Sequence, residues 1–180
     1  MTCLETLPPP PLAESCIAVL ETKRLVLRAP RLEDAKAIAA IANDRRIAEN
    51  TARIPHPYRP ADAEAWISST NLNLEPGNET YVITLNGAII GGCGFDLGEG
   101  PAPEIGYWLG AKYWGKGYAT EAVRAVIAWG DQRFGVESRS LCLIHPENRA
   151  SLRVAEKCGY RELRRVTYKN DPAIILGRLA

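Results

Sequence analysis

The stretch Lys112-Tyr113-Trp114-Gly115-Lys116-Gly117-Tyr118-Ala119-Thr120-Glu121-Ala122 is the most informative part of this 180-residue sequence. A β-prone run, residues 104–109, precedes it, and a run with apolar residues at helical spacing follows. The first turn of a helix leaves several peptide N–H groups without helical partners. Gly115 and Gly117 tolerate positive φ, so consecutive N–H groups can converge on one anion, helped by the helix dipole and the two lysines. The junction therefore predicts a binding site for a diphosphate.

The known nucleotide-binding loops do not match this junction. No G-x-x-x-x-G-K-[ST] run is present, so the sequence lacks a P-loop. A dinucleotide fingerprint would need Gly or Ala at position 120, which is Thr, and an acidic residue at the end of the next strand, which 138–144 lacks. These absences disfavour a nucleotide-binding switch. Without further context, the G-x-G turn is as compatible with a tight turn as with a ligand site.

The rest of the chain alternates β-prone and helical runs. Asn86-Gly87, between two β-prone runs, is typical of a hairpin, and three glycines at 91, 92 and 94 indicate a bulge or a closely approached backbone. We expect helices from Leu32, from about Pro60, after the glycine loop and over 147–157, and strands at 25–27, 81–85, 88–90, 104–109, 140–144, 160–166 and 173–179. This order predicts one mixed α/β domain over residues 20–180, after a proline-rich extension at 1–19.

Composition excludes several classes of protein. The sequence is 46% hydrophobic with a net charge of +1, which gives no electrostatic footprint for a nucleic acid or a membrane surface as partner. Its five cysteines share no C-x-x-C spacing, which favours reduced cysteines and no metal site. We find neither a signal peptide nor about 18 consecutive apolar residues, and we expect a cytoplasmic protein.

The junction closely resembles the acyl-CoA diphosphate loop of the GCN5-related N-acetyltransferases (GNAT), whose pattern is [QR]-x-x-G-x-[GA]. Residues 113–122 match the version found in the ribosomal-protein N-terminal acetyltransferase (RimJ/RimL-like) branch. Three further stretches, 20–30, 104–109 and 148–160, are similar to the corresponding parts of that branch. Lys112 departs from the Gln or Arg of the general pattern. The resemblance covers roughly residues 20–180. It implies a mixed α/β GNAT fold, with a largely antiparallel sheet of about seven strands, splayed between the fourth and fifth, and about four flanking helices.

The resemblance implies transfer of an acetyl group from acetyl-CoA, without a metal, to a primary amine, most often the N-terminal α-amino group of a protein or peptide. The pantetheine arm would pair with the edge of the fourth strand, where the N–H of Trp108 or Leu109 would polarise the acetyl carbonyl. The implied contacts with acetyl-CoA are Tyr107, Trp108, Leu109, Trp114, Gly115, Lys116, Gly117, Tyr118, Ala119, Thr120, Asn148 and Ser151.

Two residues are candidates for catalysis. Glu104 occupies the position where family members often carry a base that acts through water, and Ser151 stands where many members have the tyrosine that approaches the sulfur. Each has a structural alternative: Glu104 as a solvated charge paired with an arginine, and Ser151 as a small residue packed on its helix. Asn148 has one too, since Asn is a preferred N-cap.

The sequence leaves several acceptors of the acetyl group as alternatives. A polyamine or aminoglycoside is an alternative to a protein N-terminus, and a non-catalytic acyl-CoA-binding module is an alternative to an enzyme. The family shapes the acceptor site with segments that correspond to residues 43–75 and 164–173, where Arg45, Arg46, Arg53 and Arg59 could attract an acidic acceptor or form a solvated face. Pairing across a sheet edge could give a homodimer.

Overall fold

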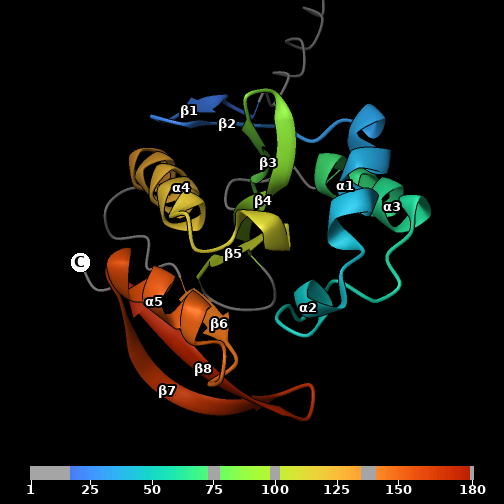
Figure 1. The fold of residues 1–180 in the computed structure, drawn as a ribbon. Helices are drawn as coiled ribbons and strands as arrows, with labels where there is room; N and C mark the ends of the chain where they lie inside the picture. The colour runs from blue at the N-terminus through green and yellow to red at the C-terminus, as the bar shows by residue number, and fades with distance from the viewer. Residues whose placement is uncertain (1–16, 73–77, 98–101, 135–140, 179–180) are drawn as a thin grey trace, which may run out of the picture.

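One twisted sheet forms the centre of the protein (Figure 1). The computed structural model describes residues 17–72, 78–97, 102–134 and 141–178. Within these ranges the sheet has eight strands in the order β1-β2-β3-β4-β5-β6-β8-β7, and all neighbours except β5 and β6 are antiparallel. The strands are β1 (Leu20–Glu21), β2 (Leu25–Arg28), β3 (Thr80–Leu85), β4 (Ala88–Asp96), β5 (Glu104–Leu109), β6 (Leu141–Ile144), β7 (Tyr160–Tyr168) and β8 (Asp171–Arg178).

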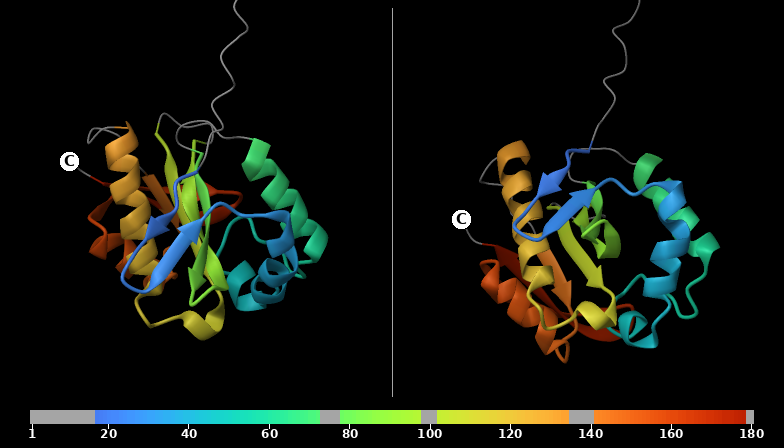
Figure 2. Two further views of the ribbon diagram at one scale, coloured as in Figure 1. Left: turned by 90° about the horizontal axis from the view of Figure 1, so that it is seen from above. Right: turned by 45° about the horizontal axis from the view of Figure 1, so that its top comes forward.

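Helices cover both faces of the sheet, as the two views in Figure 2 show. One face carries α1 (Ala35–Ala42) and α3 (Pro60–Leu72), with the short α2 (Arg45–Ala48) between them in the chain; the other carries α4 (Tyr118–Phe134) and α5 (Arg149–Lys157). Two short 3-10 turns, η1 (Leu32–Asp34) and η2 (Ala111–Tyr113), precede α1 and α4. No helix in the described ranges combines the length and apolar character that a membrane span requires.

Each face has its own apolar core. The larger core lies under α4 and α5, where Ala122, Val123, Val126 and Ile127 of α4 are all buried, which confirms the apolar stripe expected from their spacing. The smaller core joins α1 and α3 to the opposite face through residues that include Ile38, Ala42, Ala63, Ile67 and Val82. Burying both faces fixes which residues of each strand point to which layer.

The mixed α/β fold expected from the sequence is confirmed, with local differences. The described sheet has one strand more than the seven expected, because the two-residue β1 pairs with β2. Helix α2 has only four residues and gave no periodic signal in the sequence. The last two strands extend to the turn Lys169-Asn170, whose positive φ values of 50° and 70° are those of a tight hairpin. Most of the 1–19 extension lies outside the described residues.

The glycines of β4 serve the close approach of neighbouring strands. The strand does not stop at Ile90, as the 88–90 expectation implied, but continues to Asp96. Its pairing with β3 shifts by one residue just before Gly91, which is a bulge. A Cβ atom on Gly91 would lie 2.1 Å from the carbonyl oxygen of Trp108, and one on Gly94 would lie 2.4 Å from that of Glu79. Any side chain at these positions would push the strands apart.

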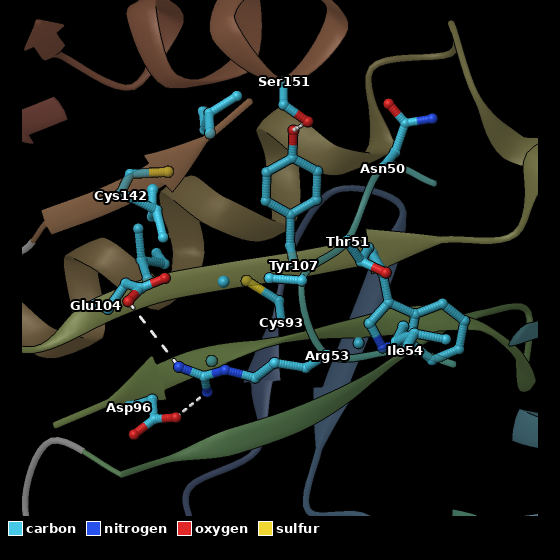
Figure 3. A pocket seen from close by; sticks show the side chains of 18 of the residues that line it. Asn50, Thr51, Arg53, Ile54, Cys93, Asp96, Glu104, Tyr107, Cys142 and Ser151 are labelled. Carbon is cyan, nitrogen blue, oxygen red and sulfur yellow. Dashed lines mark hydrogen bonds and ion pairs between the residues drawn. The ribbon is translucent and has the colours of Figure 1, made fainter. Parts of the chain in front are cut away.

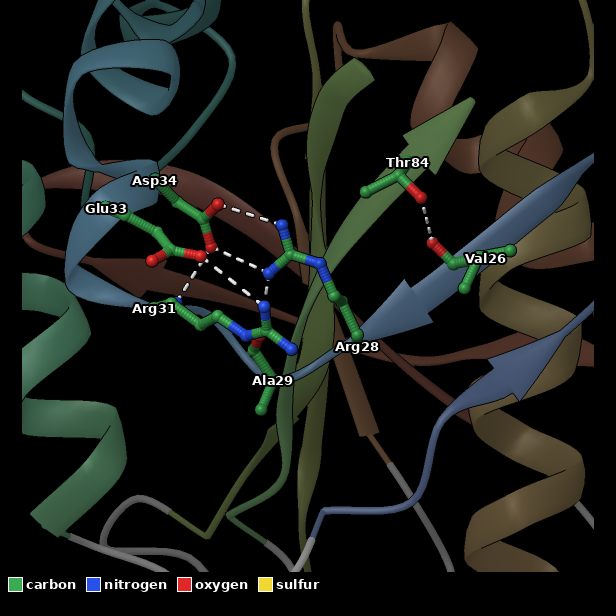
Figure 4. A network of polar contacts seen from close by, with 7 residues as sticks. All are labelled: Val26, Arg28, Ala29, Arg31, Glu33, Asp34 and Thr84. Carbon is green, nitrogen blue, oxygen red and sulfur yellow. Dashed lines mark hydrogen bonds and ion pairs between the residues drawn. The ribbon is translucent and has the colours of Figure 1, made fainter. Parts of the chain in front are cut away.

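A buried ion pair ties the end of β2 to the start of the first helical layer (Figure 4). Both guanidinium Nη atoms of Arg28 donate to the carboxylate of Asp34 at 2.8 Å, and the peptide N–H of Arg31 donates to the same carboxylate at 2.8 Å. Asp34 is 6% exposed. Burial alone would raise the pKa of Asp34, but these donors outweigh it and the pKa is lowered. The carboxylate is therefore charged at neutral pH.

The sheet opens between β5 and β6. These parallel strands pair at Glu104 and Leu141, and β6 is otherwise paired with β8. The additional strand β1 shifts the numbering by one, so β5 and β6 correspond to the fourth and fifth strands of the expected fold. The sheet therefore splays between the two strands where this was expected. The opening leaves the C-terminal half of β5 without a neighbouring strand on one edge and gives access to the middle of the sheet.

Candidate active site at the splayed strands

A cavity of about 780 Å³ lies at this opening (Figure 3). Its wall brings together five of the residues expected to act in catalysis or to contact acetyl-CoA: Glu104, Tyr107, Trp108, Asn148 and Ser151. They come from β5, from α5 and from the residue that caps α5. The wall also contains residues of β4 and β6, and it is completed by residues of α3, of the α2–α3 connection and of the β7–β8 turn. These correspond largely to the segments expected to shape the acceptor site.

The alternation of side chains along β5 divides the cavity between the two faces of the sheet. Tyr107 packs against the core under α4 and α5, whereas Trp108 packs against the core under α1 and α3. Glu104, an even number of residues from Trp108, shares the face of Trp108. Figure 3 shows the result: Tyr107 reaches to Ser151 on α5, while Arg53 approaches Glu104 from the α2–α3 connection. The cavity thus runs through the sheet.

Glu104 lies beside an arginine and a second carboxylate. It is the partner of Asp96 across β4 and β5, and Nη2 of Arg53 lies 4.0 Å from its Oε2 atom. Arg53 also donates a hydrogen bond to Asp96. Burial raises the pKa of Glu104 and the Asp96 charge adds to this, although Arg53 acts in the opposite direction. A carboxylate with a raised pKa is a better proton acceptor near neutral pH than an ordinary surface glutamate.

Hydroxyl groups meet on the other side of the opening. The phenol of Tyr107 donates a hydrogen bond to Oγ of Ser151 at 3.0 Å. Asn148 is the N-cap of α5: its Oδ1 accepts from the peptide N–H of Ser151 at 3.1 Å, and its Nδ2 donates to the carbonyl of Asn50 at 3.4 Å. The structural alternative for Asn148 is therefore realised, and the cap also holds Ser151 at the cavity wall.

The main chain of β5 points selected N–H groups into the opening. The peptide N–H of Gly110 donates to the carbonyl of Ile90 on β4 at 2.9 Å, and the Trp108 carbonyl points to β4 as well. Because successive residues of a strand direct their peptide groups to opposite edges, Tyr107 and Leu109 face the β6 side. Two N–H groups were expected to polarise the acetyl carbonyl. Strand alternation turns that of Trp108 toward β4 and that of Leu109 toward the opening, which favours Leu109.

The glycine loop lies beyond this edge, between β5 and α4, outside the cavity wall. Gly115 and Gly117 have φ values of 75° and 81°. Within the described part of the chain, the peptide N–H groups of residues 115–120 donate no hydrogen bond, and Glu121 is the next donor, to the carbonyl of Gly117 at 3.1 Å. Six consecutive donors at a helix N-terminus fit the diphosphate predicted from the sequence.

Contacts behind the loop hold it in this shape. Arg24 of the β1–β2 connection donates to Glu121 at 2.7 Å and to the carbonyl of Lys116 at 2.9 Å, and its guanidinium lies 4.5 Å from the centre of the Tyr118 ring. The indole of Trp114 donates to the carbonyl of Leu109 at 2.7 Å. The loop is therefore preorganised. The two remaining members of the expected set, Ala119 and Thr120, lie in the first turn of α4.

Sequence reasoning missed two features of the site. Tyr107 was expected at the site as part of the strand edge, but the contact of its side chain with α5 was not, although strand alternation places the side chain on that face. The arginines of the 43–75 segment were expected either to attract an acidic acceptor or to form a solvated face, and their partners were not foreseen: Arg45 pairs with Glu49, Arg46 with Asp44 and Arg53 with Asp96. These pairs offset part of the positive charge of the segment.

Comparison with known proteins identifies the family. Residues 24–161 match the family model described as an acetyltransferase (GNAT) domain. The chain is 29% identical over 147 residues to an uncharacterized N-acetyltransferase, p20, of Bacillus licheniformis, a match that covers 79% of this chain and 82% of that protein.

Two solved structures share the fold. A GNAT acetyltransferase from Bacillus anthracis gives a TM-score of 0.75 at 23% identity, covering 90% of this chain and 98% of that one. The RimL ribosomal L7/L12 α-N-protein acetyltransferase in complex with coenzyme A gives 0.79 at 18% identity, covering 90% and 98%. Since the family model spans well over half of the sequence, the chain belongs to the GNAT family and is an acetyl-CoA-dependent N-acetyltransferase.

Proposed function

We propose that the acceptor is the N-terminal α-amino group of a protein or peptide. The observation that carries this proposal is Glu104, which lines the cavity with a raised pKa. An α-amino group has a pKa of about 8, so presenting it neutral at pH 7 costs about 1.4 kcal/mol, against about 4.6 kcal/mol for a lysine side chain. A single carboxylate acting through water is an adequate base for an α-amino group but a weak one for a lysine side chain.

The residues of the chain divide the work of acetyl transfer. The free N–H groups of residues 115–120 hold the diphosphate, and the N–H of Leu109 donates to the acyl carbonyl oxygen, on which negative charge develops. Glu104 takes the proton of the acceptor amine on the α1–α3 face. Ser151 donates to the departing sulfur on the α5 face. The opening between β5 and β6 lets groups from both faces reach one reaction centre.

The comparison with RimL supports this choice, because that neighbour is an α-N-protein acetyltransferase of the same fold. The walls of the cavity supply a second argument. The side chains of Ile54, Tyr58 and Trp66 give an apolar surface beside the carboxylates of Asp96 and Glu104. An ammonium group followed by an extended, partly apolar chain complements this combination.

A small-molecule amine is the second candidate. The cavity volume of about 780 Å³ lies within the range of sites that take compact ligands. A polyamine would bring several ammonium groups to a wall that carries Asp96, Glu104 and Asp171. Arg53 and Lys169 on the same wall oppose such a ligand, which is why we rank it second.

A thiol-release assay with acetyl-CoA tests the proposal. The acceptors are a peptide with a free N-terminus and no lysine, the same peptide with a blocked N-terminus and one lysine, spermidine and an aminoglycoside. We expect the free N-terminus to release thiol fastest and mass spectrometry to place the acetyl group on its α-nitrogen. Faster release with the blocked peptide, spermidine or the aminoglycoside would overturn the assignment of the acceptor.

A further inference from the structure

The hydrogen bond between Tyr107 and Ser151 joins β5 to α5 beside the opening of the sheet, and it gives Ser151 a defined orientation. We propose, on the basis of the acetyl transfer described above, that Tyr107 is a positioning residue: it holds the hydroxyl of Ser151 so that the Ser151 proton points into the cavity, toward the sulfur that leaves the acetyl group. Neither residue reacts covalently.

Both side chains are anchored on rigid elements. Tyr107 lies on β5, which is paired along its whole length with β4, and its ring packs against the larger core. Ser151 lies in the first turn of α5, where the Asn148 cap accepts from its peptide N–H. Both residues line the cavity, as Figure 3 shows for the two facing hydroxyl groups. A contact of 3.0 Å between two anchored groups fixes direction as well as distance.

The direction follows from the donor capacity of the two hydroxyls. A phenol is more acidic than an aliphatic alcohol, so Tyr107 is the donor and Oγ of Ser151 the acceptor. A serine in a helix otherwise tends to donate to a carbonyl three or four residues earlier, which would turn its proton back to the helix. Within the described part of the chain, the Ser151 hydroxyl makes one hydrogen bond, which it accepts from Tyr107. The single Ser151 proton therefore stays available for a partner in the cavity.

Tyr107 keeps its own proton throughout. Burial raises its pKa, so the phenol is a persistent donor. When the bond between acyl carbon and sulfur breaks, its electron pair stays on sulfur, and the donated hydrogen bond from Ser151 stabilises that charge. The ammonium nitrogen loses two protons. The first passes through Glu104 and water to solvent and leaves the neutral amine, and the second, released as the amide forms, reaches the thiolate through water. The hydroxyls of Tyr107 and Ser151 therefore keep their protons over the whole reaction.

Three variants test this positioning role: Tyr107→Phe, Ser151→Ala and the double variant, assayed with whichever amine the wild-type protein acetylates fastest. We expect each single variant to lower kcat by at least about tenfold, with KM for acetyl-CoA and the affinity for CoA changed little. The double variant should be no slower than the slower single variant, because the two hydroxyls act as one unit.

Tyr81→Phe is the matched control, since it removes the phenol oxygen of a buried tyrosine on β3 that does not line the cavity. It should leave kcat unchanged. A Tyr107→Phe variant with wild-type kcat would overturn the inference, and so would multiplying losses in the double variant or a loss that lies in KM and CoA affinity. Failure of the proposed acceptor would leave these comparisons intact, because they use the best amine found.

Discussion

Nη2 of Arg53 lies 4.0 Å from Oε2 of Glu104, although one residue belongs to the α2–α3 connection and the other begins β5. The same guanidinium also pairs with Asp96, the cross-strand neighbour of Glu104. Arg53 therefore offsets two adjacent carboxylates on the α1–α3 side of the cavity. Its charge lowers the pKa of Glu104, against the larger upward effect of burial.

Replacing Arg53 should change the pH dependence of the reaction. In Arg53→Ala the pKa of Glu104 rises further, because burial and the Asp96 charge then act without opposition. The base works in its ionised form, so the acidic limb of the kcat/KM profile should move to higher pH. Arg53→Lys retains the charge and should leave the limb in place, as should Arg45→Ala, which breaks an exposed ion pair. If the acidic limb of the kcat/KM profile stays in place in Arg53→Ala, Arg53 does not influence the pKa of the catalytic base.

Glu104 itself can be tested by removing its charge. We expect Glu104→Gln to lower kcat/KM by at least about tenfold near neutral pH, with little change in KM for acetyl-CoA. Steady-state kinetics over a range of pH give both values. Glu162→Gln, at an exposed carboxylate of β7, is the control and should match the wild type. A wild-type pH profile in Glu104→Gln would remove Glu104 from the mechanism.

The glycine loop allows a test with a matched backbone change. Gly115 and Gly87 have φ values of 75° and 79°, and a Cβ atom on either would meet no atom within 4 Å. Alanine at each position should therefore cost a similar free energy of unfolding, about 1–2 kcal/mol. Gly115→Ala should also weaken CoA binding by about tenfold, because it disturbs the N–H groups of the loop.

Gly87→Ala, in the β3–β4 turn, should leave the affinity for CoA unchanged while lowering Tm to a similar extent. Calorimetry and thermal unfolding of the two variants provide the comparison. Equal CoA affinity in both would show that the loop conformation does not contribute to binding.

The Arg28–Asp34 pair predicts a stability that depends on pH. Asp34→Asn removes a buried charge partner and should lower the free energy of unfolding by about 3 kcal/mol at neutral pH. The folded-state pKa of Asp34 is depressed, so its contribution is present above the unfolded pKa of about 3.9 and is lost as pH falls through the folded pKa. Urea unfolding at pH 7 and about pH 3 should show the difference between wild type and variant shrinking in acid.

Glu33→Gln, at an exposed carboxylate next to Asp34, is the control and should change the free energy of unfolding by less than about 1 kcal/mol. A difference for Asp34→Asn that stays the same in acid would contradict the assignment of the effect to the Asp34 charge.

The sequence predicted the parts of the site that depend on local pattern. The glycine loop lies between a strand and a helix that are contiguous with it, so spacing alone was sufficient to place Gly115 and Gly117 at a helix N-terminus. The Asn86-Gly87 turn and the buried face of α4 are local in the same way. The N-cap geometry of Asn148 also follows from its position before α5.

Contacts between distant segments could not be predicted in this way. The approach of Arg53 to Glu104 depends on how the α2–α3 connection folds against β5, and no period in the sequence encodes that path. The Tyr107–Ser151 bond depends on the angle at which α5 crosses the opening. Strand alternation does place Glu104 and Tyr107 on opposite faces of the sheet, and applying it would have identified Tyr107 as a side chain of the site.

The proposed acetyl transfer requires that the free peptide N–H groups of residues 115–120 hold the diphosphate of coenzyme A. Titration of the wild-type protein with CoA by calorimetry at two temperatures tests it most directly. We predict saturable binding at one site per chain at micromolar concentrations, with pantetheine, which lacks the diphosphate, binding far more weakly. No heat at either temperature up to millimolar CoA, or equal affinity for pantetheine, would contradict the claim.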